Sequence, residues 1–206
     1  MFTNRLPRRQ NGLTLIELVM FIVIVGVALA GILMVMNITI RHSADPMIRK
    51  QALAIAESLL EEIELQPFTY CDPDDPDAPT AKSTVDCKVQ AQGLGPTPAM
   101  AYTDPDSGIQ VNLPAETRYV EPRFDNVGDY NGFAMNGIRT FENTEIGTLN
   151  GYNAAVAVTT VGKTTFGFTD AENANALQID VTVTAPGGEA ITLTGYRFRY
   201  APRAVP

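Results

Sequence analysis

The hydrophobic positions of this chain change their pattern along its length, and the first pattern is an unbroken apolar run. Residues 18–36 contain no charged side chain over 19 positions, and a helix needs about 20 such residues to cross the hydrocarbon core of a bilayer. A helix also pairs all its backbone groups internally, as lipid requires. We therefore expect a membrane-spanning helix at about 18–36.

An amphipathic helix is expected next, over residues 47–66. Its apolar residues recur every three or four positions and so share one face, namely Ala52, Ile55, Ala56, Leu59 and Ile63. Pro46 would either kink one continuous helix or begin a second one. Pro67 ends the pattern.

The last third of the chain alternates apolar and polar residues, which is typical of half-buried strands. Residues 152–158 and 177–184 alternate throughout, and the residues Pro-Gly-Gly at 186–188 mark a turn before another strand. In that last strand the apolar phase changes at Gly195, so we predict a β-bulge there. An antiparallel meander of three or more strands that covers the amphipathic helix would be an α+β fold.

Between these elements, residues 67–123 contain nine prolines and little periodicity, so irregular structure is expected. Cys71 and Cys87 both lie in this stretch. If the stretch is exported, a disulfide is expected, and closing a loop of that size would stabilise the fold by about 3 kcal/mol in the chain-entropy model. In a reducing compartment both would be free thiols.

Charge and composition narrow the function. The net charge is -8, and the only charges in residues 1–12 are three arginines, so the remainder carries -8 - 3 = -11. Such an acidic body argues against a nucleic-acid partner, which needs clustered Lys and Arg. We find no Ser/His/Asp set and no Gly-rich phosphate loop, so we expect neither an enzyme nor a cofactor.

One carboxylate, Glu17, lies at the edge of the apolar run, shortly after the arginines and Gly12. A cleaved secretory signal would give way to a polar mature start, whereas the residues after the small-residue pattern at 28–30 stay apolar. A plain single-span anchor leaves Glu17 unexplained, because a charge costs about 2.5–3.5 kcal/mol at the bilayer centre and less near its edge.

The N-terminal sequence resembles the class III signal of type IV prepilins. The resemblance lies in a basic leader, Gly12, the residues LTLIE and the apolar run. The resemblance implies that a membrane-embedded prepilin peptidase cuts between Gly12 and Leu13, and that Leu13 is then N-methylated. Leu13 departs from the Phe that usually begins mature members of the family. The new amine would lie one helical turn from Glu17, and the family's glutamate is thought to meet the amine of a neighbouring subunit.

This resemblance also implies an organisation and a location. The fold would be α+β and pilin-like, with a long N-terminal helix, membrane-spanning in its first half, packed on a C-terminal antiparallel sheet. Residues 1–12 would be the leader, 13–66 the spine helix and 67–206 a periplasmic or extracellular head. The chain would cross the inner membrane once before assembly and belong to a surface pilus afterwards. Its partners would be major and minor pilin subunits, prepilin peptidase, the inner membrane and the assembly platform.

Longer stretches resemble one group of these proteins, the MshD-type minor pilins of the mannose-sensitive haemagglutinin (MSHA) pilus. They are IRKQALAIAESLLEEIELQPFTYCDPDD, RFDNVGDYNGF and, more loosely, VTVTAPGGEAITLTGYRFRY. The resemblance implies a minor pilin that acts in pilus assembly, initiation or tip structure. The alternatives are a minor pseudopilin of a type II secretion system, with the same chemistry at Gly12 and Glu17, and a membrane-tethered periplasmic binding protein.

Two acidic segments are weak calcium candidates. The first is a run of aspartates separated by prolines, Asp72, Asp74, Asp75 and Asp77, which is more typical of a solvated turn. The second comprises Asp125, Asp129 and Asn131, but the EF-hand register would place Val127 and Ile138 at ligand positions. We assign no metal to either, and an adhesive surface would be sought first among the exposed Asx and Tyr residues of 123–133.

Overall fold

The computed structural model describes residues 12, 14–104 and 107–199. The predicted leader, apart from Gly12, and Leu13 lie outside the described residues. The chain divides into two units, Met1–Met47 and Ile48–Pro206, and each is described by itself. One helix, α1 (Leu15–Glu64), contributes to both units and contains Pro46, so the structure continues the helix through this proline.

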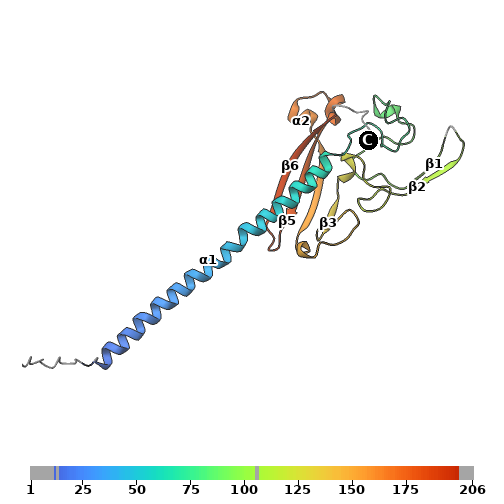
Figure 1. The fold of residues 1–206 in the computed structure, drawn as a ribbon. Coiled ribbons are helices and arrows are strands. Elements are labelled where there is room, and N and C mark those ends of the chain that lie inside the picture. Colours follow the sequence, from blue (N-terminus) through green and yellow to red (C-terminus); the bar gives the residue numbers. More distant parts are fainter. Residues whose placement is uncertain (1–11, 13, 105–106, 200–206) are drawn as a thin grey trace, which may run out of the picture. The chain divides into compact units, whose positions relative to one another are not determined.

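In the first unit, the structure describes Gly12, Thr14 and the part of α1 from Leu15 to Met47 (Figure 1). The segment Leu15–Asn37 is long and apolar enough to cross a membrane, and none of it is buried. It contains the predicted span at 18–36. The first helical turn forms where the backbone N–H groups of Glu17 and Leu18 donate to the Thr14 carbonyl, at 3.1 and 3.2 Å.

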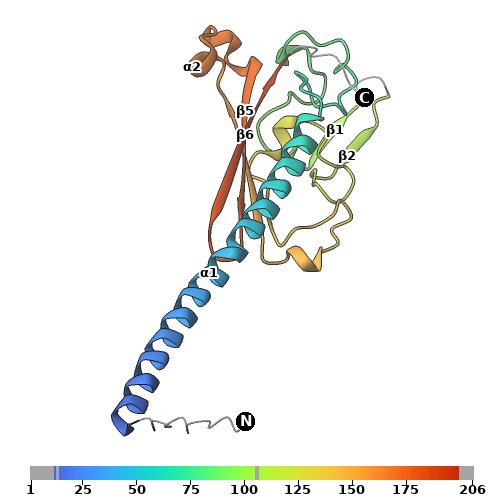
Figure 2. The ribbon, with the colours of Figure 1, turned by 60° about the vertical axis from the view of Figure 1, so that its left-hand side comes forward.

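The second unit is built on a four-stranded antiparallel sheet in the order β3-β4-β5-β6 (Figures 1 and 2). Its strands are β3 (Ala134–Asn136), β4 (Asn153–Thr160), β5 (Ala176–Thr184) and β6 (Ala190–Phe198). A separate hairpin pairs β1 (Met100–Thr103) with β2 (Gln110–Leu113). Short helices fill several connections, namely α2 (Gly162–Phe166) and four 3-10 turns, Thr84–Asp86, Val127–Tyr130, Gly147–Leu149 and Asp170–Asn175. The fold is α+β and pilin-like in architecture, with a meander as predicted.

The core of this unit lies between the sheet and residues 48–64 of α1. Four residues of the predicted apolar helix face are buried in it, namely Ala52, Ala56, Leu59 and Ile63. The alternation of the strands supplies the other side, through Ala154, Val156, Val158, Leu177, Ile179, Val181 and Val183. The period-two and period-3.6 patterns therefore meet at one interface, as expected.

The predicted bulge at Gly195 is wrong. Strand β6 pairs with β5 in continuous register, with Gly195 opposite Ile179 and Thr194 opposite Asp180. The apolar phase changes because Gly195 occupies the helix-facing side, where a Cβ would lie 2.9 Å from Leu60 Cδ1. The aromatic residues Tyr196 and Phe198 mark the outer face, where both rings contact Phe166.

Residues 67–123 were predicted to be irregular, but the structure places the hairpin of β1 and β2 within them. The other described residues of this region are irregular apart from the 3-10 turn Thr84–Asp86, and a disulfide joins Cys71 to Cys87. The Asp75 carboxylate organises the same loop, because it accepts the backbone N–H groups of Val89 and Gln90 at 2.6 and 2.9 Å. Burial alone would raise the pKa of Asp75, but these backbone donors lower it below its usual value. One carboxylate thus replaces regular secondary structure as the partner of these backbone groups.

Candidate functional sites: a processing motif and an acidic cluster

Gly12 lies just before the first turn of α1 and is exposed. No atom lies within 4 Å of the position where a Cβ would project, so the fold itself does not require glycine here. Any requirement for glycine must therefore come from another molecule that binds this segment. An exposed, non-helical glycine is a backbone that a peptidase can bind in extended form.

Glu17 lies in the first turn of α1 and is exposed. A carboxylate in this turn interacts favourably with the partial positive charge of the unpaired N–H groups at the helix N-terminus. If the chain is cut after Gly12, the new amine at position 13 would be four residues away. The same turn would then hold opposite charges at the start of an apolar helix.

The rest of this helix segment is apolar around its whole circumference. Its large side chains are all at least one-third exposed, and Leu15, Phe21, Val27 and Met34 are each more than 60% exposed. A helix that is hydrophobic on every side needs an apolar environment on every side. Lipid or the helices of other chains can supply it.

A second site lies in the second unit, where carboxylates from three separate loops meet. One oxygen from each of Asp72, Asp74, Glu116 and Asp125 lies within 4.8 Å of every other. We call these four residues the acidic cluster. Asp72 and Glu116 are 4% and 5% exposed, whereas Asp74 is exposed. The cluster therefore reaches from the interior to solvent.

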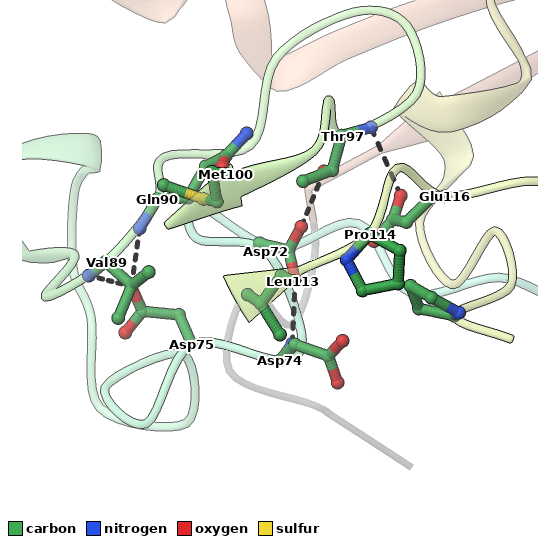
Figure 3. A pocket seen from close by; sticks show the side chains of 11 residues that line it. Asp72, Asp74, Asp75, Val89, Gln90, Thr97, Met100, Leu113, Pro114 and Glu116 are labelled. Atoms are coloured by element: carbon green, nitrogen blue, oxygen red, sulfur yellow. Dashed lines mark hydrogen bonds between the residues drawn. The ribbon is translucent and has the colours of Figure 1, made fainter. Parts of the chain in front are cut away.

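Backbone contacts explain why these loops meet. Asp72 N donates to the Gln90 carbonyl and Glu116 N donates to the Thr97 carbonyl, at 3.1 and 3.0 Å. Thr97 links both, since its hydroxyl donates to Asp72 Oδ2 at 2.6 Å and its N–H donates to Glu116 Oε2 at 3.2 Å (Figure 3). Asp125 Oδ1 is buried and has no hydrogen-bond partner among the residues that the structure describes.

The cluster's electrostatics follow from burial and from like charges. Burial, followed by neighbouring carboxylates, raises the pKa of Glu116 to about 9 and that of Asp125 to about 8. The same two causes raise the pKa of Asp74. At these pKa values Glu116 and Asp125 are mainly protonated at neutral pH.

The structure divides the predicted calcium candidates. Of the candidates Asp125, Asp129 and Asn131, only Asp125 belongs to the cluster. Asp129 instead accepts the N–H groups of Asn126 and Asp125, at 2.7 and 3.2 Å. Asn131 Oδ1 accepts the N–H group of Val158 at 2.9 Å. Asp72 and Asp74 come from the other candidate segment. Glu116 was not among the predicted candidates, because it lies outside both segments and no spacing relates it to them.

The expectation that the Asx and Tyr residues of 123–133 are exposed is wrong. Asn126 and Asp129 are fully buried, and Tyr130 is 1% exposed. The Asn126 amide donates to Thr69 Oγ1 at 2.8 Å, and Tyr130 packs edge-on against Phe124. These polar residues hold the loops together instead of facing a ligand.

A comparison with known proteins bears on the first site. Residues 7–33 match the family described as the prokaryotic N-terminal methylation motif. The match encloses Gly12, Leu13 and Glu17 and continues into the apolar helix. The chain thus carries the motif of prepilin-like proteins, which include type IV pilins and pseudopilins. No curated protein and no solved structure matches the chain.

Proposed function

We propose that the chain is a minor pilin of an MSHA-like type IV pilus, with a structural role and no reaction of its own. Prepilin peptidase cuts between Gly12 and Leu13, and Leu13 is then N-methylated. The observation that carries the proposal is the methylation motif at 7–33, most of which lies on the helix segment Leu15–Asn37, a segment with no buried residue.

In this proposal Glu17 directs assembly. A carboxylate in an apolar environment is costly when it stands alone, and a nearby amine offsets much of that cost. The amine at Leu13 of a neighbouring subunit is such a partner. The electrostatic stabilisation of a subunit is therefore greatest when its helix is inserted at the depth that places its Glu17 beside that amine.

The choice of a minor pilin over a pseudopilin rests on the two longer stretches, 48–75 and 123–133, that resemble MshD-type minor pilins. These stretches contact each other in the fold. Val127 N donates to the Pro67 carbonyl at 3.1 Å, and Asn126 Nδ2 donates to Thr69 Oγ1 at 2.8 Å. A resemblance that falls on two interacting segments supports a shared structural unit better than two unrelated matches would.

The first test is to shear filaments from intact cells and sequence the N-terminal peptide of this protein by mass spectrometry. A peptide that begins with N-methyl-Leu13 in the sheared fraction would support the proposal. The same peptide found only in the membrane fraction would favour a type II secretion pseudopilin. An intact start at Met1 in both fractions would contradict the processing step and favour a tethered binding protein.

The role of Glu17 needs its own variant. Glu17→Gln removes the charge at nearly constant shape, so the protein should insert into the membrane and be cut, but enter filaments less. Glu57→Gln is the matched control, because Glu57 is exposed in the same helix within the second unit. Equal incorporation of both variants would overturn the proposed role.

A further inference from the structure

We propose that the free edge of strand β6 binds an extended, basic segment of another protein chain, which joins the sheet as a further strand. β6 is the last strand in the order β3-β4-β5-β6, so only one of its edges is paired within the sheet (Figures 1 and 2). An open edge strand presents a row of unpaired backbone groups to other chains. This binding is separate from filament assembly and does not depend on processing of the N-terminus.

The hydrogen-bond pattern shows which backbone groups of β6 point away from the sheet. In an antiparallel ladder, every second residue directs both its N–H and its C=O towards the neighbouring strand. Just before β6, the Glu189 carbonyl accepts the N–H group of Ala185 at 2.8 Å, and the register with β5 is then continuous. The alternate residues therefore direct their backbone groups outward, and all of them are exposed, namely Ala190, Thr192, Thr194, Tyr196 and Phe198.

β6 lacks the features that usually protect such an edge. Protected edge strands are short or carry prolines, lysines or bulges. β3, at the opposite edge, has only three residues, whereas β6 has nine and contains no proline, lysine or bulge. Its one charged side chain, Arg197, donates to the Gln66 carbonyl at 3.3 Å and is thus directed to the end of α1. An edge of this length and composition is suited to pairing with another strand.

The spacing of the outward groups selects the class of partner. They repeat every two residues, which is about 6.8 Å along an antiparallel strand. An extended peptide backbone has the same repeat, whereas a helix pairs its backbone groups internally. On the outer face, Tyr196 and Phe198 are 43% and 41% exposed, and β-branched side chains of an added strand pair favourably with such rings.

The helix-facing side of the edge indicates a basic partner. Leu60 and Glu64 of α1 lie against Gly195, since a Cβ there would be 2.9 Å from Leu60 Cδ1 and would meet Glu64 Oε1. Glu57 precedes Leu60 by three positions and so shares this helix face. Both glutamates are exposed. Alternate side chains of an added strand lie on this side, where Lys or Arg would be attracted to the two carboxylates.

A second copy of this chain fits the edge less well. Antiparallel pairing of two β6 strands is two-fold symmetric, so the same helix face of both copies would lie on one side of the joined sheet. Glu57 and Glu64 would then be present twice on that side, and like charges brought together repel. We therefore assign the edge to a different, basic chain.

The test uses the full chain in detergent micelles and the capped peptide Thr-Lys-Thr-Val-Thr-Lys-Thr. When it pairs with residues 190–196, its threonines lie opposite the outward-facing residues and its lysines lie on the side of Glu57 and Glu64. Amide hydrogen exchange is followed by NMR with and without millimolar peptide. We expect new protection at the even-numbered residues of β6, because the amides of the odd-numbered ones are already bonded within the sheet.

Thr192→Pro removes one outward N–H group, so the affinity for the peptide should fall at least tenfold. The substitution keeps every bond to β5, and proline is tolerated at such edge positions. Thr192→Val is the matched control, because it keeps the N–H group and should bind like the wild type. A peptide with N-methylated threonines tests the same bonds without changing the protein, and it should not bind.

The charge requirement is tested by replacing both peptide lysines with glutamate, which should weaken binding at least tenfold. Equal binding of the two peptides would overturn the basic partner. The edge site itself would be overturned by no new protection at millimolar peptide, by protection outside the even-numbered residues alone, or by equal binding of the N-methylated peptide. Protection that increases with protein concentration in the absence of peptide would assign the edge to a second copy and overturn the proposed partner.

Discussion

Glu62 on α1 and Arg118 in the irregular region form a two-pronged ion pair, with Arg118 Nε and Nη2 each 2.7 Å from a Glu62 oxygen. Both side chains are largely buried, at 12% and 6% exposed. The Tyr130 hydroxyl donates to Glu62 Oε1 at 2.9 Å, and the guanidinium stacks on the Phe141 ring at 4.6 Å. This pair fixes a region without regular structure to the helix.

Breaking the pair from one side should be strongly destabilising. Arg118→Met leaves Glu62 buried and unpaired, and we expect a loss of about 3–5 kcal/mol in the free energy of unfolding. Glu62→Gln combined with Arg118→Met should cost less than the sum of the two single changes. Urea unfolding of all three variants in detergent measures this coupling. Additive losses would mean that the contact contributes little beyond its separate parts.

Gly195→Ala should destabilise the protein. A Cβ there would meet Glu64 Oε1 and lie 2.9 Å from Leu60 Cδ1, so the substitution must move the ends of these two side chains. Overpacking of this kind costs about 1–3 kcal/mol. Gly147→Ala is the control, because no atom lies within 4 Å of its Cβ position. Equal Tm values for the two variants would contradict the predicted cost of overpacking at Gly195.

Tyr130 should make the protein sensitive to alkali. Burial, followed by the charge of Glu62, raises the pKa of Tyr130 above its usual value near 10. Above pH 10 the unfolded phenol ionises while the folded one stays neutral, so the free energy of unfolding falls as the pH rises. Tyr130→Phe removes this contribution. Between about pH 8 and 11, the free energy of unfolding should fall less steeply for the variant than for the wild type. Parallel curves would contradict the prediction.

Gly12→Val should separate processing from folding. The Cβ position of Gly12 is open, so the variant should fold and insert like the wild type. If prepilin peptidase requires glycine before the cut, the variant should keep its first 12 residues, which intact-mass spectrometry detects. Cleavage at the normal rate would refute the proposed recognition of Gly12.

Elements with a regular period could be predicted from the sequence, and contacts between irregular loops could not. The buried face of α1 and the alternation of β4 and β5 follow from repeats of 3.6 and 2 residues. The bulge at Gly195 was predicted wrongly, because the glycine is explained by the closeness of Leu60 on the helix. No local sequence pattern indicates that contact. The acidic cluster could not be predicted for the same reason, since Glu116 and Asp72 are far apart in the sequence and Thr97 bridges them in the fold.

The unburied segment Leu15–Asn37 has a consequence for energetics. Every buried residue of the main core comes from position 52 onward, so the head needs nothing from this segment for its own core. For a subunit that moves from a bilayer into a filament, the helix exchanges one apolar environment for another, and burial of apolar surface favours neither. The direction of the transfer is then decided by the few polar groups that the two environments treat differently, and Glu17 is the charged group on this segment.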